Sequence, residues 1–252
     1  MVEGKFRQQG RLLVLGAILL VVAVVTTQGK EKETKLETVD SGSFAVYSSG
    51  QRVATETFSI TRNQEGSIVS SRFKSTQGEN TAEQASELEL TPAVEIRRYE
   101  WKEVSPGKMQ AVVTPAEPFL SERYSVGPDD KSQTQNFLLP TTTAILDDYF
   151  FIHREVLAWK FLATGCRKEG GPLQCPLNQK ILFGTLNPHE RSSMSVSVQF
   201  NGKEKLNLRG GQQEYSRFLL SSEMGDWVFW LDDAFKMVRL KDNGGGTEVV
   251  RD

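Results

Sequence analysis

The feature that most constrains the fold of this chain is a strict alternation of apolar and polar residues. The clearest case is SMSVSVQF, in which every second residue from Met194 to Phe200 is apolar. A period of two places these side chains on one face of a β-strand. KEKLNL repeats the pattern, with Leu206 and Leu208 facing inward. Asn201-Gly202 lies between the two segments and predicts a tight hairpin turn, because both residues tolerate the positive φ angles that such turns need.

The same alternation recurs along most of the chain and predicts roughly a dozen strands. The first three are expected at about residues 43–49, 52–61 and 67–76, with glycine-, proline- and asparagine-containing turns between strands throughout. This meander predicts one mainly all-β domain over residues 43–252. We expect a strongly curved antiparallel sheet, or half-barrel, wrapped around a single central helix.

That helix is predicted from about Asp148 to Ala163. Apolar residues recur there at spacings of three and four, which places them on one helix face. They are Tyr149, Ile152, Val156, Trp159 and Ala163. Asp147 or Asp148 is expected to cap the first turn by accepting hydrogen bonds from free backbone N–H groups. A helix with this much apolar surface must be covered, so we expect it to fill the concave face of the sheet.

Acids and a histidine around the start of this helix raise the question of a metal or acid–base site. His153 lies five residues after Asp148 and two before Glu155, so neither pair shares a helix face. We therefore expect His153 at the helix edge, with Arg154 and Glu155 in solvent. The other histidine, His189, lies in a predicted turn, and a catalytic triad is recognised only by its geometry. We predict no catalytic residue, no metal and no cofactor.

The N-terminal end carries a membrane signal. No charged residue interrupts the chain from Leu12 to Gly29, and basic residues precede this run. A signal-peptide core needs about 7–15 apolar residues and a full span about 20, and this run falls between them. We predict an uncleaved anchor within residues 1–29; a cleaved signal peptide and a buried core helix are the alternatives. The anchor residues are Leu12, Leu15, Ile18, Leu19, Val22 and Val25.

The positions of the charges predict how the chain is oriented. Basic residues before the apolar run place the short N-terminus in the cytoplasm by the positive-inside rule. Residues 30–42 are charged and polar and predict a tether, so the β domain is expected outside the cytoplasm. The prediction is a single-pass protein of a bacterial inner membrane with a periplasmic main domain. The net charge of −2 offers no general positive field, so we predict no nucleic-acid partner.

The two cysteines are consistent with a location outside the cytoplasm. Cys166 and Cys175 flank a short loop with glycine and proline at its tip, which predicts a disulfide in an oxidising compartment. Two reduced thiols are the alternative. A zinc site is less favoured, because two cysteines leave two metal ligands unaccounted for.

Aromatic residues provide candidates for a ligand site. Trp227 and Trp230 lie three apart on one predicted strand, so they should face opposite sides of the sheet. Aromatic side chains on a concave sheet commonly form a core, but they also line sites for acyl chains and other apolar ligands. The ligand-binding candidates are Phe150, Trp159 and Trp227.

Several features together resemble a known group of proteins. An N-terminal export or anchor segment precedes an entry motif that begins at Gly42 and Phe44 and ends at Phe58 and Ile60. An ILDDYFFIH segment and a closing WLDDAFKMVRL strand pair follow. The chain resembles uncharacterised bacterial cell-envelope proteins with domains of unknown function. The resemblance implies a curved antiparallel sheet around a helix, similar to the half-barrel of the LolA and LolB lipoprotein carriers, and it transfers no catalytic residues.

Three functional hypotheses follow. The leading one is a non-enzymatic, membrane-anchored protein that binds a lipid, a lipid-modified protein or another hydrophobic ligand in the concave sheet. The second is an accessory or scaffolding subunit of a membrane complex, which uses the anchor and the edge of the sheet. The third is a hydrolase of unknown substrate that uses His153 or His189. The first two leave no residue signature that distinguishes them.

Overall fold

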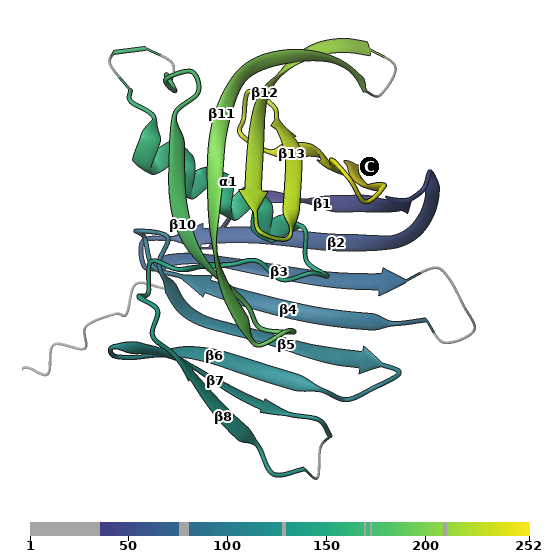
Figure 1. Ribbon diagram of the computed structural model, residues 1–252, viewed down its shortest axis with the longest axis vertical. Helices are drawn as coiled ribbons and strands as arrows, with labels where there is room; N and C mark the ends of the chain where they lie inside the picture. The colour runs from purple at the N-terminus through teal and green to yellow at the C-terminus, as the bar shows by residue number, and fades with distance from the viewer. Residues whose placement is uncertain (1–35, 76–80, 128–129, 169, 172, 209–210) are drawn as a thin grey trace, which may run out of the picture. The chain divides into compact units, whose positions relative to one another are not determined.

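A computed structural model of the chain shows a mainly β domain with one helix (Figure 1). It describes residues 36–75, 81–127, 130–168, 170–171, 173–208 and 211–252. These residues belong to one compact unit, Thr34–Asp252. The predicted membrane anchor, including Leu12, Leu15, Ile18, Leu19, Val22 and Val25, lies outside the described residues. Within the described part of the chain, no helix has the length and apolar character needed to cross a membrane.

In the part of the chain that the structure describes, fifteen strands form a single sheet, which confirms the predicted mainly all-β class. The N-terminal half of the sheet contains β1 (Glu37–Ser48), β2 (Gln51–Asn63), β3 (Gly66–Ser75), β4 (Glu83–Leu90), β5 (Ile96–Ser105), β6 (Gln110–Ala116), β7 (Phe119–Ser125) and β8 (Gln133–Phe137). The C-terminal half contains β9 (Ala144–Ile145), β10 (Lys180–Asn187), β11 (Ser192–Leu208), β12 (Gly211–Ser222), β13 (Gly225–Leu231), β14 (Met237–Asp242) and β15 (Thr247–Arg251). β1 begins at Glu37, inside the segment that was predicted to be a tether.

The sheet is built from two antiparallel meanders, and the first strand of the domain pairs with the last strand at its centre. Successive strands pair antiparallel from β1 to β8 and from β10 to β15, while β9 pairs parallel with β10. β1 pairs with β15, with Phe44 opposite Arg251, and this contact joins the two halves. The first and last strands of the domain therefore lie side by side, and β8 and β9 form the two ends of the sheet.

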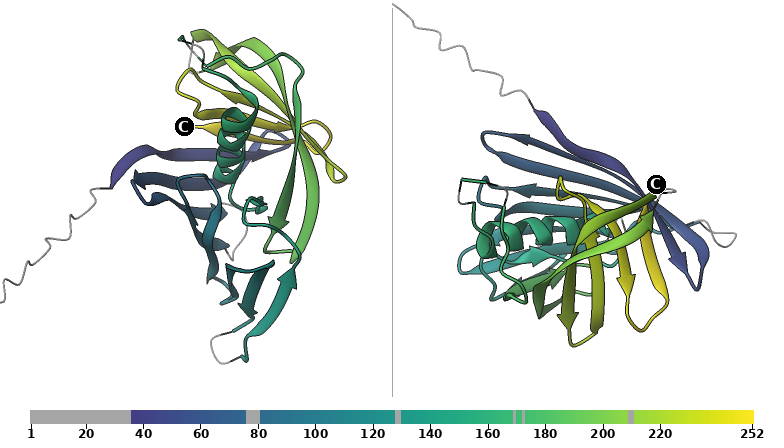
Figure 2. Two further views of the ribbon diagram at one scale, coloured as in Figure 1. Left: turned by 90° about the vertical axis from the view of Figure 1, so that its left-hand side faces the viewer. Right: turned by 90° about the horizontal axis from the view of Figure 1, so that it is seen from above.

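The helix α1 (Ile152–Gly165) lies between the two halves of the sheet (Figure 2). We call the sheet face that packs against α1 the helix-side face. The main core forms there, and Phe150, Leu157 and Phe161 of the helix region are completely buried in it. A smaller cluster on the opposite face contains Leu206, Tyr215, Val228, Trp230 and Val238. Trp227 packs at the edge of the main core and Trp230 in the smaller cluster, which confirms that the two indoles face opposite sides.

The predicted hairpin at Asn201-Gly202 was wrong. The chain continues through this pair as one strand, β11, and the register with β12 shifts between Phe200 and Lys203. Gly202 has a φ of +87°, so the glycine supports a β-bulge instead of a turn. A bulge and a hairpin need the same local backbone freedom. The pairing of β11 with β12, which continues before and after the bulge, decides between them.

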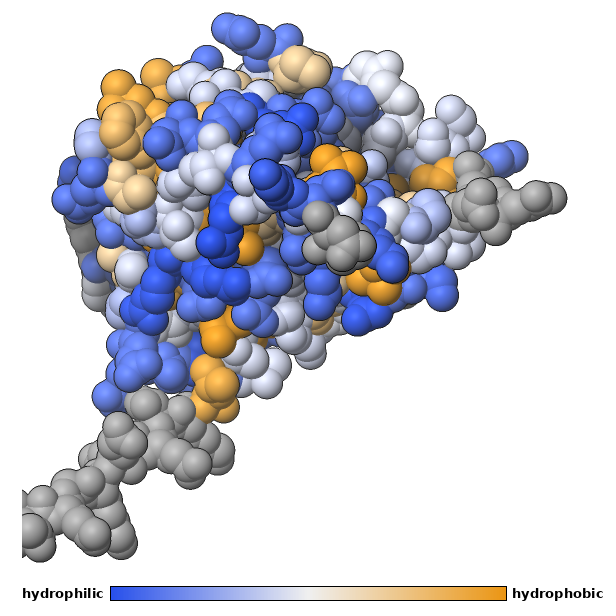
Figure 3. Space-filling view, turned by 90° about the horizontal axis from the view of Figure 1, so that it is seen from below, coloured by the Kyte–Doolittle hydropathy of each residue, from blue (hydrophilic) through white to orange (hydrophobic). Residues whose placement is uncertain are grey.

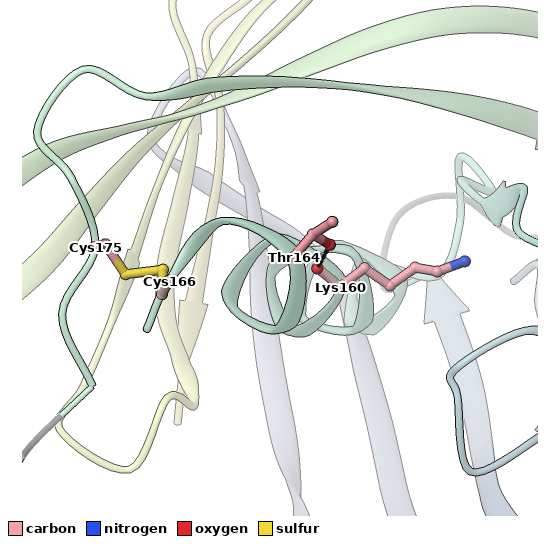
Figure 4. Close-up of a disulfide and its surroundings, with 4 residues drawn as sticks. All are labelled: Lys160, Thr164, Cys166 and Cys175. Atoms are coloured by element: carbon pink, nitrogen blue, oxygen red, sulfur yellow. Dashed lines mark hydrogen bonds between the residues drawn. A yellow bond between two sulfur atoms is a disulfide. The ribbon is translucent and has the colours of Figure 1, made fainter. Parts of the chain in front are cut away.

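The predicted disulfide between Cys166 and Cys175 is present, and it lies just beyond the last turn of α1 (Figure 4). A backbone bridge between Arg167 and Gln174 closes the loop inside it. The Lys160 ammonium, which points away from the disulfide in the same view, donates hydrogen bonds to the carbonyl oxygens of Thr142 at 2.7 Å and Thr143 at 3.3 Å. The helix is thus tied to the chain before it and to the loop after it.

Candidate functional site

The strongest concentration of polar side chains lies on the helix-side face, around His189. This histidine belongs to the 188–191 turn between β10 and β11, as the sequence predicted. Its Nδ1 lies 2.6 Å from Asp147 Oδ2, and its Nε2 lies 2.5 Å from Gln84 Oε1. The Tyr99 hydroxyl donates to the same Asp147 oxygen at 2.7 Å, and the Trp101 ring stacks on the imidazole with centroids 3.7 Å apart. We call Gln84, Tyr99, Trp101, Asp147 and His189 the His189 cluster.

Asp147 is the charged centre of this cluster. Its burial alone would raise its pKa, but the hydrogen bond and the charge of His189 hold the pKa below its usual value. Burial raises the pKa of Tyr99 well above the usual tyrosine value, and the negative charge of Asp147 adds to the effect. Asp147 therefore stays ionised and Tyr99 stays a hydrogen-bond donor. The carboxylate joins the loop before α1 to β5 and to the 188–191 turn.

The ring nitrogens of His189 are arranged differently from those of a nucleophile-activating histidine. In a triad, one nitrogen meets a carboxylate and the other faces the hydroxyl or thiol that it deprotonates. Here Nδ1 does meet a carboxylate, but Nε2 faces the side-chain oxygen of Gln84. Both ring nitrogens are thus engaged by protein side chains, and neither faces a hydroxyl or a thiol. This geometry favours a structural attachment of the turn over general-base catalysis.

His153 was predicted at the helix edge and is instead buried, with 1% of its surface exposed. Its ring packs against Tyr99 with centroids 5.5 Å apart. Neither ring nitrogen has a hydrogen-bond partner among the described residues. Burial lowers the pKa of His153 to about 3, against the opposing charge of Asp147, so the ring is neutral.

The start of α1 is capped by a residue that is distant in sequence. The predicted caps, Asp147 and Asp148, precede the helix by several residues, because it begins at Ile152. The Glu56 carboxylate on β2 takes their place and accepts from the backbone N–H of Phe151 at 2.7 Å and of Ile152 at 3.2 Å. Burial raises the pKa of Glu56 to about 7, although these hydrogen bonds oppose the shift.

Arg154 and Glu155 were predicted in solvent, and both are buried. The Arg154 guanidinium donates to the carbonyl oxygens of Asp147 and Phe150. Glu155 accepts from the backbone N–H of Met237 at 2.7 Å and from the Arg251 guanidinium at 2.9 Å. The prediction failed because the helix is covered on more than one side. Residues opposite its apolar stripe also meet the sheet.

Arg251 connects this part of the helix to the junction of the sheet halves. Its guanidinium lies 2.7 Å from Asp40 on β1 as well as 2.9 Å from Glu155, and Lys236 lies 2.9 Å from the same aspartate. Burial would raise the pKa of Asp40, but the hydrogen bonds from Arg251 and Lys236 lower it. Burial raises the pKa of Glu155 to about 8 despite the charge of Arg251. Asp40, Glu155, Lys236 and Arg251 together form a second attachment of α1 to the sheet.

Several buried polar atoms on the helix-side face have no hydrogen-bond partner among the described residues. They are Ser86 Oγ, Trp101 Nε1, both carboxylate oxygens of Glu122 and both ring nitrogens of His153. Burial raises the pKa of Glu122 to about 8, while Arg191 of the 188–191 turn opposes the shift. A neutral, protonated Glu122 is the form that such surroundings favour.

The three predicted ligand residues lie in the main core or pack against it. Phe150 has no exposed surface and belongs to the core. Trp159 is partly buried, and its indole N–H donates to the Phe235 carbonyl at 2.8 Å. Trp227 is partly buried against the main core. A pocket of about 330 Å³ lies elsewhere, between the β11–β12 hairpin and β14–β15, and its lining includes Gln213, Tyr215, Asp232 and Arg251.

Most of this polar centre was not predicted from the sequence. Glu56, Gln84 and Glu122 each occupy an inward position of an alternating strand, where the pattern leads one to expect an apolar residue. That position is the signal that could have identified them. Within the described part of the chain, no group of three or more histidine, cysteine or acidic residues is placed to hold a metal ion.

Comparisons with known proteins give little further information. No protein-family model matches the chain, and no curated protein matches it. Among solved structures, it is similar to a DUF1089 family protein from Pseudomonas aeruginosa, with 9% sequence identity and a TM-score of 0.44. The match covers 77% of this chain and 91% of that one.

Proposed function

We propose that this protein is a non-enzymatic accessory or scaffolding subunit of a membrane complex. Its N-terminal segment holds it in a bacterial inner membrane, and the β domain lies in the periplasm and contacts a protein partner through an end of the sheet. The observation that carries this proposal is that α1 fills the helix-side face. Phe150, Leu157 and Phe161 have no exposed surface, so the face offers little to a ligand.

The energetic cost of emptying that face supports the proposal. Taking one large apolar side chain out of a core costs about 1.5–3 kcal/mol, and three such residues of the helix region would have to leave together. The buried contacts of Glu56 and Glu155 would also break. The face in Figure 3 is largely hydrophilic, with apolar residues in several separate groups.

Purification of the full chain from membranes in mild detergent tests this function. Mass spectrometry of the purified material would identify bound proteins and bound lipids, and the intact mass would show whether residues 1–29 remain. We expect protein partners in fixed proportion and no lipid in fixed proportion. A chain that extracts alone, without any protein partner, would contradict the accessory-subunit function.

A second candidate is the binding of a lipid or another hydrophobic ligand, in a half-barrel similar to the LolA and LolB carriers. It requires α1 to move. The observation that favours it is that two buried carboxylates hold the N-terminal part of α1: Glu56 accepts from the Phe151 and Ile152 N–H groups, and Glu155 accepts from Met237 and Arg251. Burial raises the pKa of Glu56 to about 7 and that of Glu155 to about 8. A carboxyl group with a pKa near neutrality gains or loses its proton with a small change in pH, and this would alter the hydrogen bonds that hold α1.

Displacement of a fluorescent fatty-acid probe tests this candidate. If a lipid replaces α1 in the core, the variant Phe150→Ala should change the affinity for the probe, and Met224→Ala should not. Phe150 is fully buried beside the helix, whereas Met224 is 82% exposed on the β12–β13 turn. Absence of probe uptake by the unaltered protein would eliminate this candidate and leave the first one intact.

A further inference from the structure

The two ends of the sheet differ, and one of them is incompletely covered. β9 pairs only with Thr185 and Leu186 of β10. Along Lys180–Gly184, no strand of the described chain lies on the outer side of β10. This stretch therefore presents a free row of backbone donors and acceptors, which is a template for another strand. We call it the β10 edge.

The side chains of the β10 edge also indicate a missing neighbour. Ile181 and Phe183 face the helix side but remain partly exposed, whereas Val196 and Val198, opposite them on β11, are almost completely buried. Leu182 points to the other face and is 70% exposed. At the other end of the sheet, β8 presents the polar sequence QTQN before Phe137. Within the strands that the structure describes, β10 is the edge strand that carries partly exposed apolar side chains along its unpaired stretch.

We propose that the β10 edge pairs with the same edge of a second copy of this chain. The sequence of the edge is complementary to itself in an antiparallel register centred on Leu182. In that register Leu182 lies opposite Leu182 of the partner subunit, Ile181 opposite Phe183 of the partner subunit, and Lys180 opposite Gly184 of the partner subunit. Apolar residues meet apolar residues, and each lysine meets a glycine, so no like charges oppose one another. A twofold axis generates this arrangement.

This inference rests on the proposed use of an end of the sheet, and it names the edge and the partner. A five-residue strand pair buries less than the roughly 1,200 Å² that a stable interface in solution needs. We therefore expect a weak dimer in dilute solution. Two copies held in one membrane experience a much higher effective concentration, which favours the same contact. The test accordingly uses the full chain in membranes.

Cysteine cross-linking at Leu182 provides the test. Antiparallel partners have Cα atoms about 4.5–5.5 Å apart, within the range of a disulfide. The native cysteines are already joined to each other, so no described thiol competes. In membranes under mild oxidation, Leu182→Cys should form a covalent dimer with twice the monomer mass. Met224→Cys is the matched control, because Met224 is more exposed at 82% and lies away from the edge, and it should remain monomeric.

Charge substitutions at the same position separate the possible outcomes. Leu182→Lys and Leu182→Glu should each lose the dimer when expressed alone, and co-expression should restore it as a mixed dimer. If Leu182→Cys dimerises no more than Met224→Cys, the second-copy inference is wrong. If Leu182→Lys instead loses a different co-purifying protein, the edge binds that protein, and the accessory-subunit function survives. If no variant changes any association and no protein partner co-purifies, both proposals fail.

Discussion

At the scale of single residues, buried carboxylates decide how α1 is held. A helix start leaves backbone N–H groups without partners, and Glu56 supplies the acceptor from another strand. We predict that Glu56→Ala lowers the free energy of unfolding by about 2–4 kcal/mol, because two buried N–H groups and the Ser71 hydroxyl lose their partner. Denaturant unfolding would measure it. Glu87→Ala, at an exposed position of β4, is the control and should change little; equal losses in both variants would contradict the capping role.

Glu122 gives a prediction about pH. Its pKa in the folded protein is raised to about 8 from the usual 4.5. The stability that it contributes is therefore fully present below about pH 4.5 and is lost as the pH rises through about 8. We expect the melting temperature to fall from about pH 5 to about pH 8 and then to level off, and to fall less in Glu122→Gln, which cannot ionise. Thermal melts across this range test it, with exposed Glu117→Gln as a control that should follow the unaltered protein.

At the scale of elements, the bulge at Gly202 shapes the longest strand. Its φ of +87° is one that other residues adopt at a cost of about 1–2 kcal/mol. An added Cβ would also lie 3.2 Å from Leu177 Cδ1. We predict that Gly202→Ala lowers stability by about that amount in denaturant unfolding. Gly211→Ala is the control, because an added Cβ there meets no atom within 4 Å and the φ is not positive. If the two substitutions have equal effects, the bulge does not depend on glycine.

At the scale of the whole molecule, the pairing of β1 with β15 joins the two halves of the sheet. Arg251 lies on that pair and contacts Asp40 and Glu155, which are both buried. We predict that Arg251→Ala lowers stability by about 3–5 kcal/mol, because it removes the guanidinium partner of the buried Asp40 carboxylate and of Glu155. Arg52→Ala removes an ion pair to Asp252 whose side chains are about 40% exposed, and should cost at most about 1 kcal/mol. Calorimetry would compare the stabilities of the two variants. A smaller loss of stability for Arg251→Ala than for Arg52→Ala would contradict a stabilising role of Arg251 at the β1–β15 junction.

The sequence by itself determined the local structure of this protein. Alternation in segments such as Met194–Phe200 predicted strands, because side chains on a pleated backbone point to opposite faces in turn. Spacings of three and four predicted the helix, although its start at Ile152 differs from the expected Asp148. The close pair of Cys166 and Cys175 predicted the disulfide that is present. Each of these signals depends on neighbours in sequence alone.

Only the tertiary structure decided what surrounds each residue. Asn201-Gly202 has the local freedom for either a turn or a bulge, and the pairing of β11 with β12 before and after this pair selects the bulge. His153 and Glu155 are buried because sheet strands cover the helix beyond its apolar stripe. The cap by Glu56 and the contact of His189 with Gln84 join residues far apart in sequence. No local pattern encodes such contacts, because they depend on which strands become neighbours when the sheet folds against the helix.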